Sequence, residues 1–157
     1  MKRNIQIREA KPEDNGEVTA FAFEIMKSFG IQPDPENIDY ALASLGTKHE
    51  MLTKDFVAVD GDRPIGAIIL KRCTLFTGEV TGFYVRSDYQ SQGIGRILLN
   101  TVLSAAIEAG YKQIVLTTNK NLTAAINLYE SFGWLRQSEK PCNGADYLYS
   151  LNLRQSV

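Results

Sequence analysis

Apolar residues along the chain follow two spacings, one typical of strands and the other typical of helices. In the first third, a short alternating segment precedes two stretches with apolar residues every three or four positions, each closed by a glycine. The elements predicted there are a strand over 5–8, a helix from Pro12 to Gly30 and a helix from Asp34 to Gly46. Since each helix has one apolar face, we expect both to pack against a sheet.

The rest of the chain predicts mainly strands, with two further helices between them. Strands over 56–59 and 65–72 are joined by Asp60-Gly61-Asp62, a sequence typical of a hairpin turn. After a break at Thr77-Gly78, the predicted elements are a strand over 79–86, a helix from Gly95 to about Ala109 with Gly110 as its C-cap, a strand over 113–118, a helix over 124–132, and strands near Trp134 and over 147–153.

The order β-α-α-β-β-β-α-β-α-β-β predicts an α/β (α+β) fold. Hairpins in its middle favour antiparallel pairing, and the later crossover helices bring in a parallel pair, so we expect a mixed, mostly antiparallel central sheet flanked by helices. No repeat, low-complexity segment or linker interrupts the pattern. Residues 1–157 are therefore expected to form a single domain.

Composition narrows the class of protein. Hydrophobic residues make up 44% of the chain and charged residues 22%, as in soluble globular proteins. No apolar run approaches the ~18 residues of a membrane span, and no apolar stretch of a secretory signal follows the N-terminal basic residues. The two cysteines and the single histidine, His49, lack metal-ligand spacing, so we expect no metal. Few cysteines favour a cytoplasmic location.

Charge is small overall but uneven along the chain. The net charge of −1 makes nucleic acid and membranes unexpected partners. Over 11–46, two basic residues accompany seven acidic ones, whereas over 86–157 seven basic residues outnumber five acidic ones. The acidic part either attracts a cationic substrate or is a solvated helix face, and both interpretations stay open. The basic part suits an anionic ligand.

The most informative segment is Gln90-Ser91-Gln92-Gly93-Ile94-Gly95, between a predicted strand and a predicted helix. A glycine-rich turn entering a helix exposes backbone N–H groups at the positive end of the helix dipole, which makes an anion site suited to phosphate. The glycines let a pyrophosphate approach the backbone. The spacing matches neither the P-loop nor the dinucleotide motif. An ordinary turn is the alternative, and Arg96 either contacts the anion or points to water.

This loop resembles the Q/R-x-x-G-x-G/A pyrophosphate loop of the GNAT acetyltransferase superfamily, which binds coenzyme A. Two more segments appear in the family's order: a strand over Glu79–Val85, and Ala125–Trp134, which is similar to the family's A-x-x-L-Y-x-x-x-G-F signature with Trp in place of Phe. The resemblance covers roughly Phe56 to Leu153, and the first 50 residues match only in layout. It implies a GNAT fold and acetyl-CoA as co-substrate.

The resemblance implies a coenzyme A site built largely from backbone groups. In the family this strand is bulged and splays from its neighbour, so that the pantetheine arm pairs with free strand N–H and C=O groups. A glycine inside a strand, such as Gly82, is typical of a β-bulge or of a close approach of another group to the backbone. The alternative is a regular interior strand that the glycine weakens. The predicted contacts are Phe83, Tyr84, Val85, Gln90, Ser91, Gln92, Gly93, Ile94, Gly95, Arg96, Asn119 and Asn121. For Asn121 an N-cap role is a competing interpretation.

Two side chains are candidates for the chemistry that the resemblance implies. Tyr129 would hydrogen-bond the departing thiolate or protonate it. Since a phenol titrates near 10 and a thiol near 8.5, full proton transfer is uphill by ~2 kcal/mol, which favours the hydrogen bond. Glu79 occupies the place where relatives carry a base for the attacking amine. Tyr129 as a core aromatic, and water or backbone carbonyls as the base, remain alternatives, and His49 is expected to be a bystander.

The leading hypothesis is an acetyl-CoA-dependent N-acetyltransferase that acetylates a small primary amine or amino acid directly, in a ternary complex. No acetyl-enzyme is expected, because neither cysteine lies in an activating motif. The alternatives are a protein lysine or N-terminal acetyltransferase, a non-catalytic acyl-CoA-binding regulator, and a nucleotide-phosphate module. Exposed sheet edges make a homodimer possible. Candidates for the acceptor pocket are Cys142, Asn143 and Tyr147.

Overall fold

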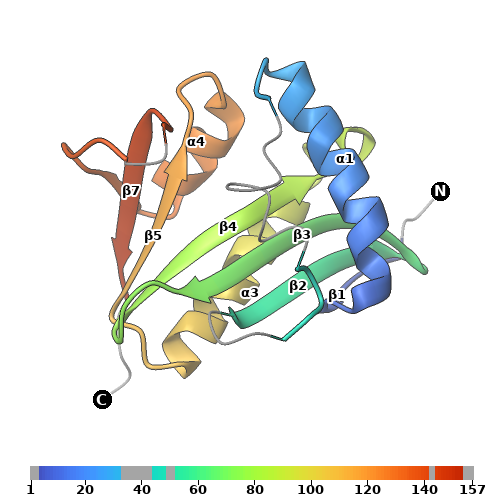
Figure 1. The fold of residues 1–157 in the computed structure, drawn as a ribbon, viewed down its shortest axis with the longest axis horizontal. Coiled ribbons are helices and arrows are strands. Elements are labelled where there is room, and N and C mark those ends of the chain that lie inside the picture. Colours follow the sequence, from blue (N-terminus) through green and yellow to red (C-terminus); the bar gives the residue numbers. More distant parts are fainter. Residues whose placement is uncertain (1–3, 33–43, 49–51, 142–143, 154–157) are drawn as a thin grey trace.

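A seven-stranded sheet is the centre of the computed structural model, which describes residues 4–32, 44–48, 52–141 and 144–153 (Figure 1). Its strands are β1 (Ile5–Glu9), β2 (Leu52–Asp60), β3 (Arg63–Arg72), β4 (Thr77–Val85), β5 (Gln113–Thr118), β6 (Leu135–Arg136) and β7 (Tyr147–Asn152). They lie in the order β1-β2-β3-β4-β5-β7-β6. Neighbouring strands are antiparallel except β4 and β5, which are parallel. The predicted mixed, mostly antiparallel sheet is confirmed.

Helices cover both faces of this sheet. Among the described residues they are α1 (Asn15–Ser28), α3 (Ile94–Glu108) and α4 (Thr123–Ser131), with short 3-10 helices η1 (Pro12–Asp14) and η2 (Ser87–Tyr89) before α1 and α3. Helix α1 crosses one face, α3 lies on the opposite face, and α4 lies beside β5 and β7 (Figure 1). None of the described helices is both long and apolar enough to cross a membrane.

Two apolar layers hold the helices to the sheet. Beneath α1, buried side chains such as Phe21 pack with Ala67 and Ile69 of β3. On the other face, Ile68 and Leu70 of the same strand join the larger layer under α3 and α4. Because successive strand side chains point to opposite faces, the continuous apolar run of β3 supplies both layers.

Two predictions about the elements need comment. The predicted helix from Asp34 to Gly46 falls mostly outside the described residues. Only its last residues, 44–46, are described, and they form a turn. The predicted break at Thr77-Gly78 is wrong, because both residues lie in β4. A Cβ on Gly78 would come within 2.8 Å of the Tyr111 ring and 2.9 Å of Leu70. This glycine is therefore required by close packing inside a strand and does not end one.

The sheet is interrupted at β4 in two ways that create the site. On its β3 side, Thr81 pairs with Ile69 and Tyr84 with Ala67, so Gly82 and the residue after it share one partner position. Gly82 has a φ of 57°, and the predicted bulge is confirmed. On the other side, β4 pairs with β5 only through 77–79 and 113–115. Beyond this short pairing the two strands part.

Candidate active site

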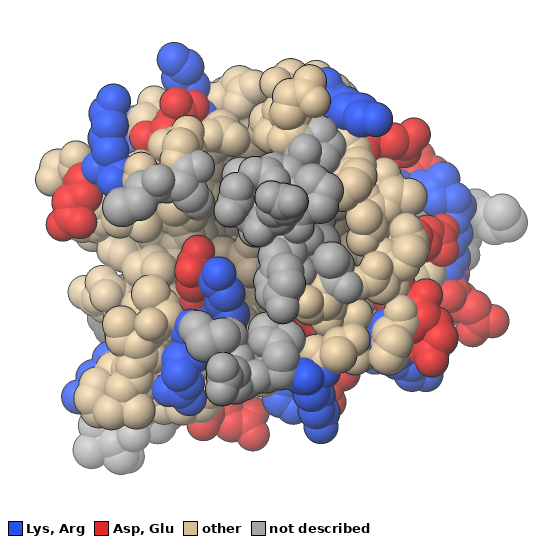
Figure 2. Space-filling view, in the orientation of Figure 1, with Lys and Arg blue, Asp and Glu red and all other residues tan. Residues whose placement is uncertain are grey.

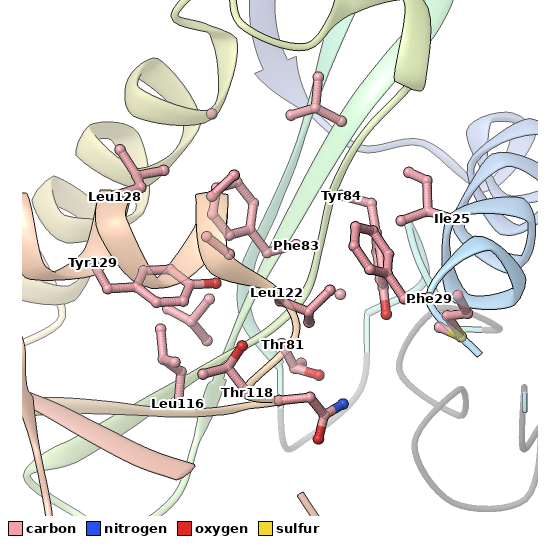
Figure 3. Close-up of a pocket in the computed structure, with 18 of the residues that line it drawn as sticks. Ile25, Phe29, Thr81, Phe83, Tyr84, Leu116, Thr118, Leu122, Leu128 and Tyr129 are labelled. Atoms are coloured by element: carbon pink, nitrogen blue, oxygen red, sulfur yellow. The ribbon is translucent and has the colours of Figure 1, made fainter. Parts of the chain in front are cut away.

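A cavity of about 1090 Å³ occupies the place where β4 and β5 part. Its lining includes Ile25 of α1 and the C-cap residue Phe29 on one side of the sheet, and Leu128 and Tyr129 of α4 on the other (Figure 3). Figure 2 shows the surface hollowed on the α1 face, with acidic and basic side chains both present around the hollow. Since α1 and α4 cover opposite faces, the cavity joins the two faces through the gap in the sheet.

The predicted anion loop forms one end of this cavity. Gly93 is the N-cap of α3 with a φ of 82° and no side-chain cap, and Ser91 also has a positive φ, 64°. The first intrahelical bond runs from the Ile97 N–H to the Gly93 carbonyl, 3.1 Å. The N–H groups of the first turn before it have no partner within the helix, so they are donors at its positive end. This is the backbone geometry of an anion site.

Three other predicted loop residues also have defined positions. Gln90 donates from Nε2 to the Val85 carbonyl at 2.9 Å and so ties the loop to β4. Gln92 is turned toward the Asp88 carbonyl, 3.5 Å, and does not line the cavity. At Gly95 a Cβ would contact Phe83 and a leucine of α4 at 3.5 Å, so any larger side chain there would enter the cavity.

Arg96 lies between the start of α3 and the end of α4. Its guanidinium donates to the Ser131 hydroxyl at 3.4 Å and stacks 5.1 Å from the centre of the Phe132 ring. The residue also lines the cavity. The side chain is exposed, so contact with an anion and orientation to water both remain predictions.

One free edge of β4 faces the gap. The Arg86 N–H donates to the Ile65 carbonyl of β3 at 2.8 Å. In an antiparallel ladder the polar groups of successive residues alternate in direction, so the N–H and C=O of Val85 point away from β3, toward the gap. The Val85 carbonyl is taken by Gln90. The Val85 N–H is therefore a backbone donor of β4 that points toward the cavity.

Tyr129 packs in the core, and its hydroxyl also reaches the cavity. Its ring lies in an aromatic cluster, with ring centres 6.2 Å from Phe83, 5.9 Å from Trp134 and 6.2 Å from Tyr149. The hydroxyl points into the cavity (Figure 3). Burial, with a smaller contribution from the Tyr84 phenol, raises the pKa of Tyr129 well above that of a free phenol. The hydroxyl therefore keeps its proton and remains a hydrogen-bond donor.

Glu79 and Lys71 face each other across β4 and β3 on the α1 side of the cavity. The two residues are partners in the antiparallel register, and both line the cavity. The Lys71 Nζ lies 3.6 Å from the Glu79 Oε1. Lys71 is absent from the sequence-based prediction, because its proximity to the site depends on the strand register. An acidic and a basic group thus share one wall of the cavity.

The two asparagines after β5 differ in their positions. Asn119 lines the cavity and accepts at Oδ1 from the Asp146 N–H, 3.3 Å. Asn121 does not line it, and its Nδ2 donates to the Phe29 carbonyl at 2.9 Å. The N-cap interpretation of Asn121 is wrong, since α4 begins at Thr123 and its N-cap is Leu122. Asn121 instead links the entry of α4 to the end of α1.

Sequence reasoning missed the contribution of α1. Its last turns supply Ile25 and Met26 to the cavity wall, and its C-cap supplies Phe29, whose side chain is 41% exposed. Of the predicted acceptor-pocket residues, Cys142 and Asn143 lie outside the described residues, as does His49, and Tyr147 does not line the cavity. Within the described part of the chain, no three His, Cys, Asp or Glu residues are grouped as a metal site would require.

Comparisons with known proteins agree with this architecture. The model of the acetyltransferase (GNAT) family matches residues 16–134. N-alpha-acetyltransferase 30 of Schizosaccharomyces pombe is 35% identical over 92 residues, which are 56% of this chain and 61% of that protein. The chain spans less than two thirds of the length of the curated relatives that it matches.

Two solved structures show the same fold at low identity. A GNAT-family acetyltransferase of Staphylococcus aureus has a TM-score of 0.84 and 23% identity, covering 96% of this chain and 100% of the other. PaiA N-acetyltransferase of Thermoplasma acidophilum, solved in complex with coenzyme A, has a TM-score of 0.74 and 18% identity, covering 95% and 99%. Because the family model matches well over half of its residues, this chain belongs to the GNAT acetyltransferase family.

Proposed function

We propose that this chain is an acetyl-CoA-dependent N-acetyltransferase that transfers the acetyl group directly to a primary amine. The observation that carries the proposal is the gap between β4 and β5, which joins the two faces of the sheet through one cavity. Two substrates can then meet inside the gap from opposite sides. A structure solved with coenzyme A among the fold neighbours supports the choice of thioester donor.

The backbone groups at the cavity fit coenzyme A in its two characteristic parts. Unpaired N–H groups at the start of α3 suit a pyrophosphate, and the absence of a side chain at Gly95 leaves room for it. The edge of β4 that faces the gap suits an amide-bearing arm that lies along the strand like an added strand. The other residues proposed to contact it are Phe83, Tyr84, Ser91, Gly93, Ile94, Arg96 and Asn119, with Gln90, Gln92 and Asn121 acting through the loops that they hold.

Three groups of the chain would act on the reacting atoms. The Val85 N–H donates to the thioester carbonyl oxygen, where negative charge grows as the amine attacks. Tyr129 donates a hydrogen bond to the departing sulfur, since its raised pKa makes it a donor and a poor acid. Glu79 takes the proton that the amine must lose, directly or through water. No acetyl-enzyme is required.

The acceptor in this proposal is a small amine or amino acid. A second candidate is the N-terminus of a protein, and the observation in its favour is the 35% identity to N-alpha-acetyltransferase 30. The two acceptors differ in what must enter the cavity. A peptide needs an open path on the α1 face for the rest of its chain, and a small molecule does not.

Thermal unfolding with acetyl-CoA, coenzyme A, ATP and NAD side by side tests the donor site. A ligand at ~100 times its dissociation constant stabilises by about 2.7 kcal/mol, a shift of roughly 5–10 °C for a domain of this size. We expect shifts with the two coenzyme A species and amine-dependent release of free thiol from acetyl-CoA. A response to ATP or NAD without one to coenzyme A would refute the proposal, and binding without thiol release would favour a non-catalytic regulator.

A further inference from the structure

Three charged side chains line the cavity among the described residues, and two of them lie where an acceptor would approach. Arg96 is at the α3 end, against Ser131 and Phe132. Lys71 and Glu79 lie on the α1 face, as cross-strand partners of β3 and β4. The acceptor side therefore offers one positive and one negative group next to each other.

The geometry of this pair leaves it open to a ligand. The 3.6 Å between the Lys71 Nζ and the Glu79 Oε1 is longer than a hydrogen bond. The two side chains are 36% and 27% exposed, which is the setting in which an ion pair contributes little to stability. A ligand that bears both charges can therefore replace the pair at little cost to the fold.

Apolar side chains also line the α1 side of the cavity. They are Ile25 and Met26 of α1, the C-cap residue Phe29 and the ring of Tyr84, of which Figure 3 labels Ile25, Phe29 and Tyr84. A lone ammonium ion there would be attracted by Glu79 and repelled by Lys71. An amino group with a carboxylate one carbon away meets both charges favourably, and an apolar side chain on that carbon suits the wall.

We propose that Lys71 is a specificity-determining residue that binds the carboxylate of an α-amino acid acceptor with an apolar side chain, while Glu79 receives its amino group. The inference rests on the proposed acetyltransferase function and names the acceptor class for the same cavity. In this arrangement the amine is held against the group that takes its proton. Polyamines and other acceptors without a carboxylate lack the contact with Lys71.

The test compares leucine, methionine and phenylalanine, each beside its amide, by thiol release from acetyl-CoA. The α-amino group of an amino acid amide is less basic than that of the free amino acid, so more of it is uncharged at neutral pH. Without a contact to the carboxylate, the amide would therefore be the better acceptor. We expect kcat/KM to be at least tenfold higher for the best acid than for its amide, with the difference mainly in KM. Lys71→Met should abolish the preference for the acid or reverse it in favour of the amide, and Lys71→Arg should keep the preference.

The matched control is Lys54→Met. Lys54 pairs with Glu9 at 3.0 Å across β2 and β1, outside the cavity, so its replacement should leave the preference unchanged. Equal kcat/KM for acid and amide in the unaltered protein, or a peptide with an N-terminal leucine preferred over leucine, would overturn the inference while the acetyltransferase function stands. The inference would also be overturned if acetyl-CoA raised the unfolding temperature and other amines were acetylated, but none of the three amino acids was. No binding of acetyl-CoA would overturn the function itself.

Discussion

Replacement of Tyr129 by phenylalanine separates the packing of this residue from its chemistry. The ring contacts Phe83, Trp134 and Tyr149 at centre distances of 5.9–6.2 Å, and a phenylalanine ring keeps all three. The hydroxyl that is lost faces the cavity (Figure 3). We therefore expect the free energy of unfolding to change by less than about 1 kcal/mol.

The kinetic cost follows from the hydrogen bond that the hydroxyl donates. A hydrogen bond to a charged group contributes about 1.5–3 kcal/mol, and the charge on sulfur appears as the thioester breaks. The loss should fall on kcat and amount to roughly 10- to 150-fold. Affinity for acetyl-CoA should stay within about twofold, because the backbone groups that hold it are unchanged.

The assay is steady-state thiol release together with calorimetric titration of acetyl-CoA. Tyr149→Phe is the matched control, because Tyr149 packs on the same ring but donates to Glu130 at 2.7 Å and does not line the cavity. It should lose about 1.5 kcal/mol of stability and keep its turnover. Unchanged kcat in Tyr129→Phe, or equal losses in the two variants, would remove the hydroxyl from the mechanism.

Four further changes probe other parts of the account. Gly95→Leu puts a side chain into the cavity, so the dissociation constant of acetyl-CoA should rise at least tenfold by calorimetry while the unfolding temperature is nearly kept; unimpaired binding would contradict the placement of the pyrophosphate. Glu79→Gln should lower kcat/KM for the amine at least tenfold at neutral pH and less at high pH, where free amine is abundant, and a uniform loss would argue against its role as base. Asn121→Ala removes the hydrogen bond that links the entry of α4 to the end of α1, so the KM for the acceptor should rise several-fold with little change in the KM for acetyl-CoA. A rise in the KM for acetyl-CoA alone would contradict a role of this link on the acceptor side. Burial raises the pKa of Asp14, but two hydrogen bonds from Arg8, 2.8 and 3.0 Å, and one from a backbone N–H outweigh it and hold the pKa below its usual value. The resulting stability is present above about pH 4 and lost as the pH falls through the lowered pKa, so Asp14→Ala should cost about 2–3 kcal/mol in urea unfolding at pH 7 and progressively less in acid.

Local backbone features of the site were predictable from the sequence. The Gln90–Gly95 loop and the bulge at Gly82 both depend on glycine, whose presence within a strand or before a helix marks an unusual conformation. The sequence can also mislead for the same reason. Gly78 suggested a break in the strand, but a glycine is required there because the Tyr111 ring approaches closely. From the sequence alone, a glycine required by close packing cannot be distinguished from one required by a turn.

Contacts between distant elements were not predictable in this way. The link from Asn121 to the Phe29 carbonyl joins residues 92 positions apart. The pairing of Lys71 with Glu79 depends on the register of β3 and β4, which shifts at the bulge. Periodicity identifies which face of an element is apolar, but it does not say which side chains of different elements meet.

Amide hydrogen exchange measured residue by residue, with and without acetyl-CoA, tests the central claim most directly. In the proposed complex, backbone N–H groups of one strand and one helix end, those of Val85 and of residues 93–96, bind the ligand. Protection on binding should therefore appear at these amides, while β1 and β2, which lie away from the cavity, change little. Binding without protection at these positions, or protection centred elsewhere in the sheet, would contradict the account.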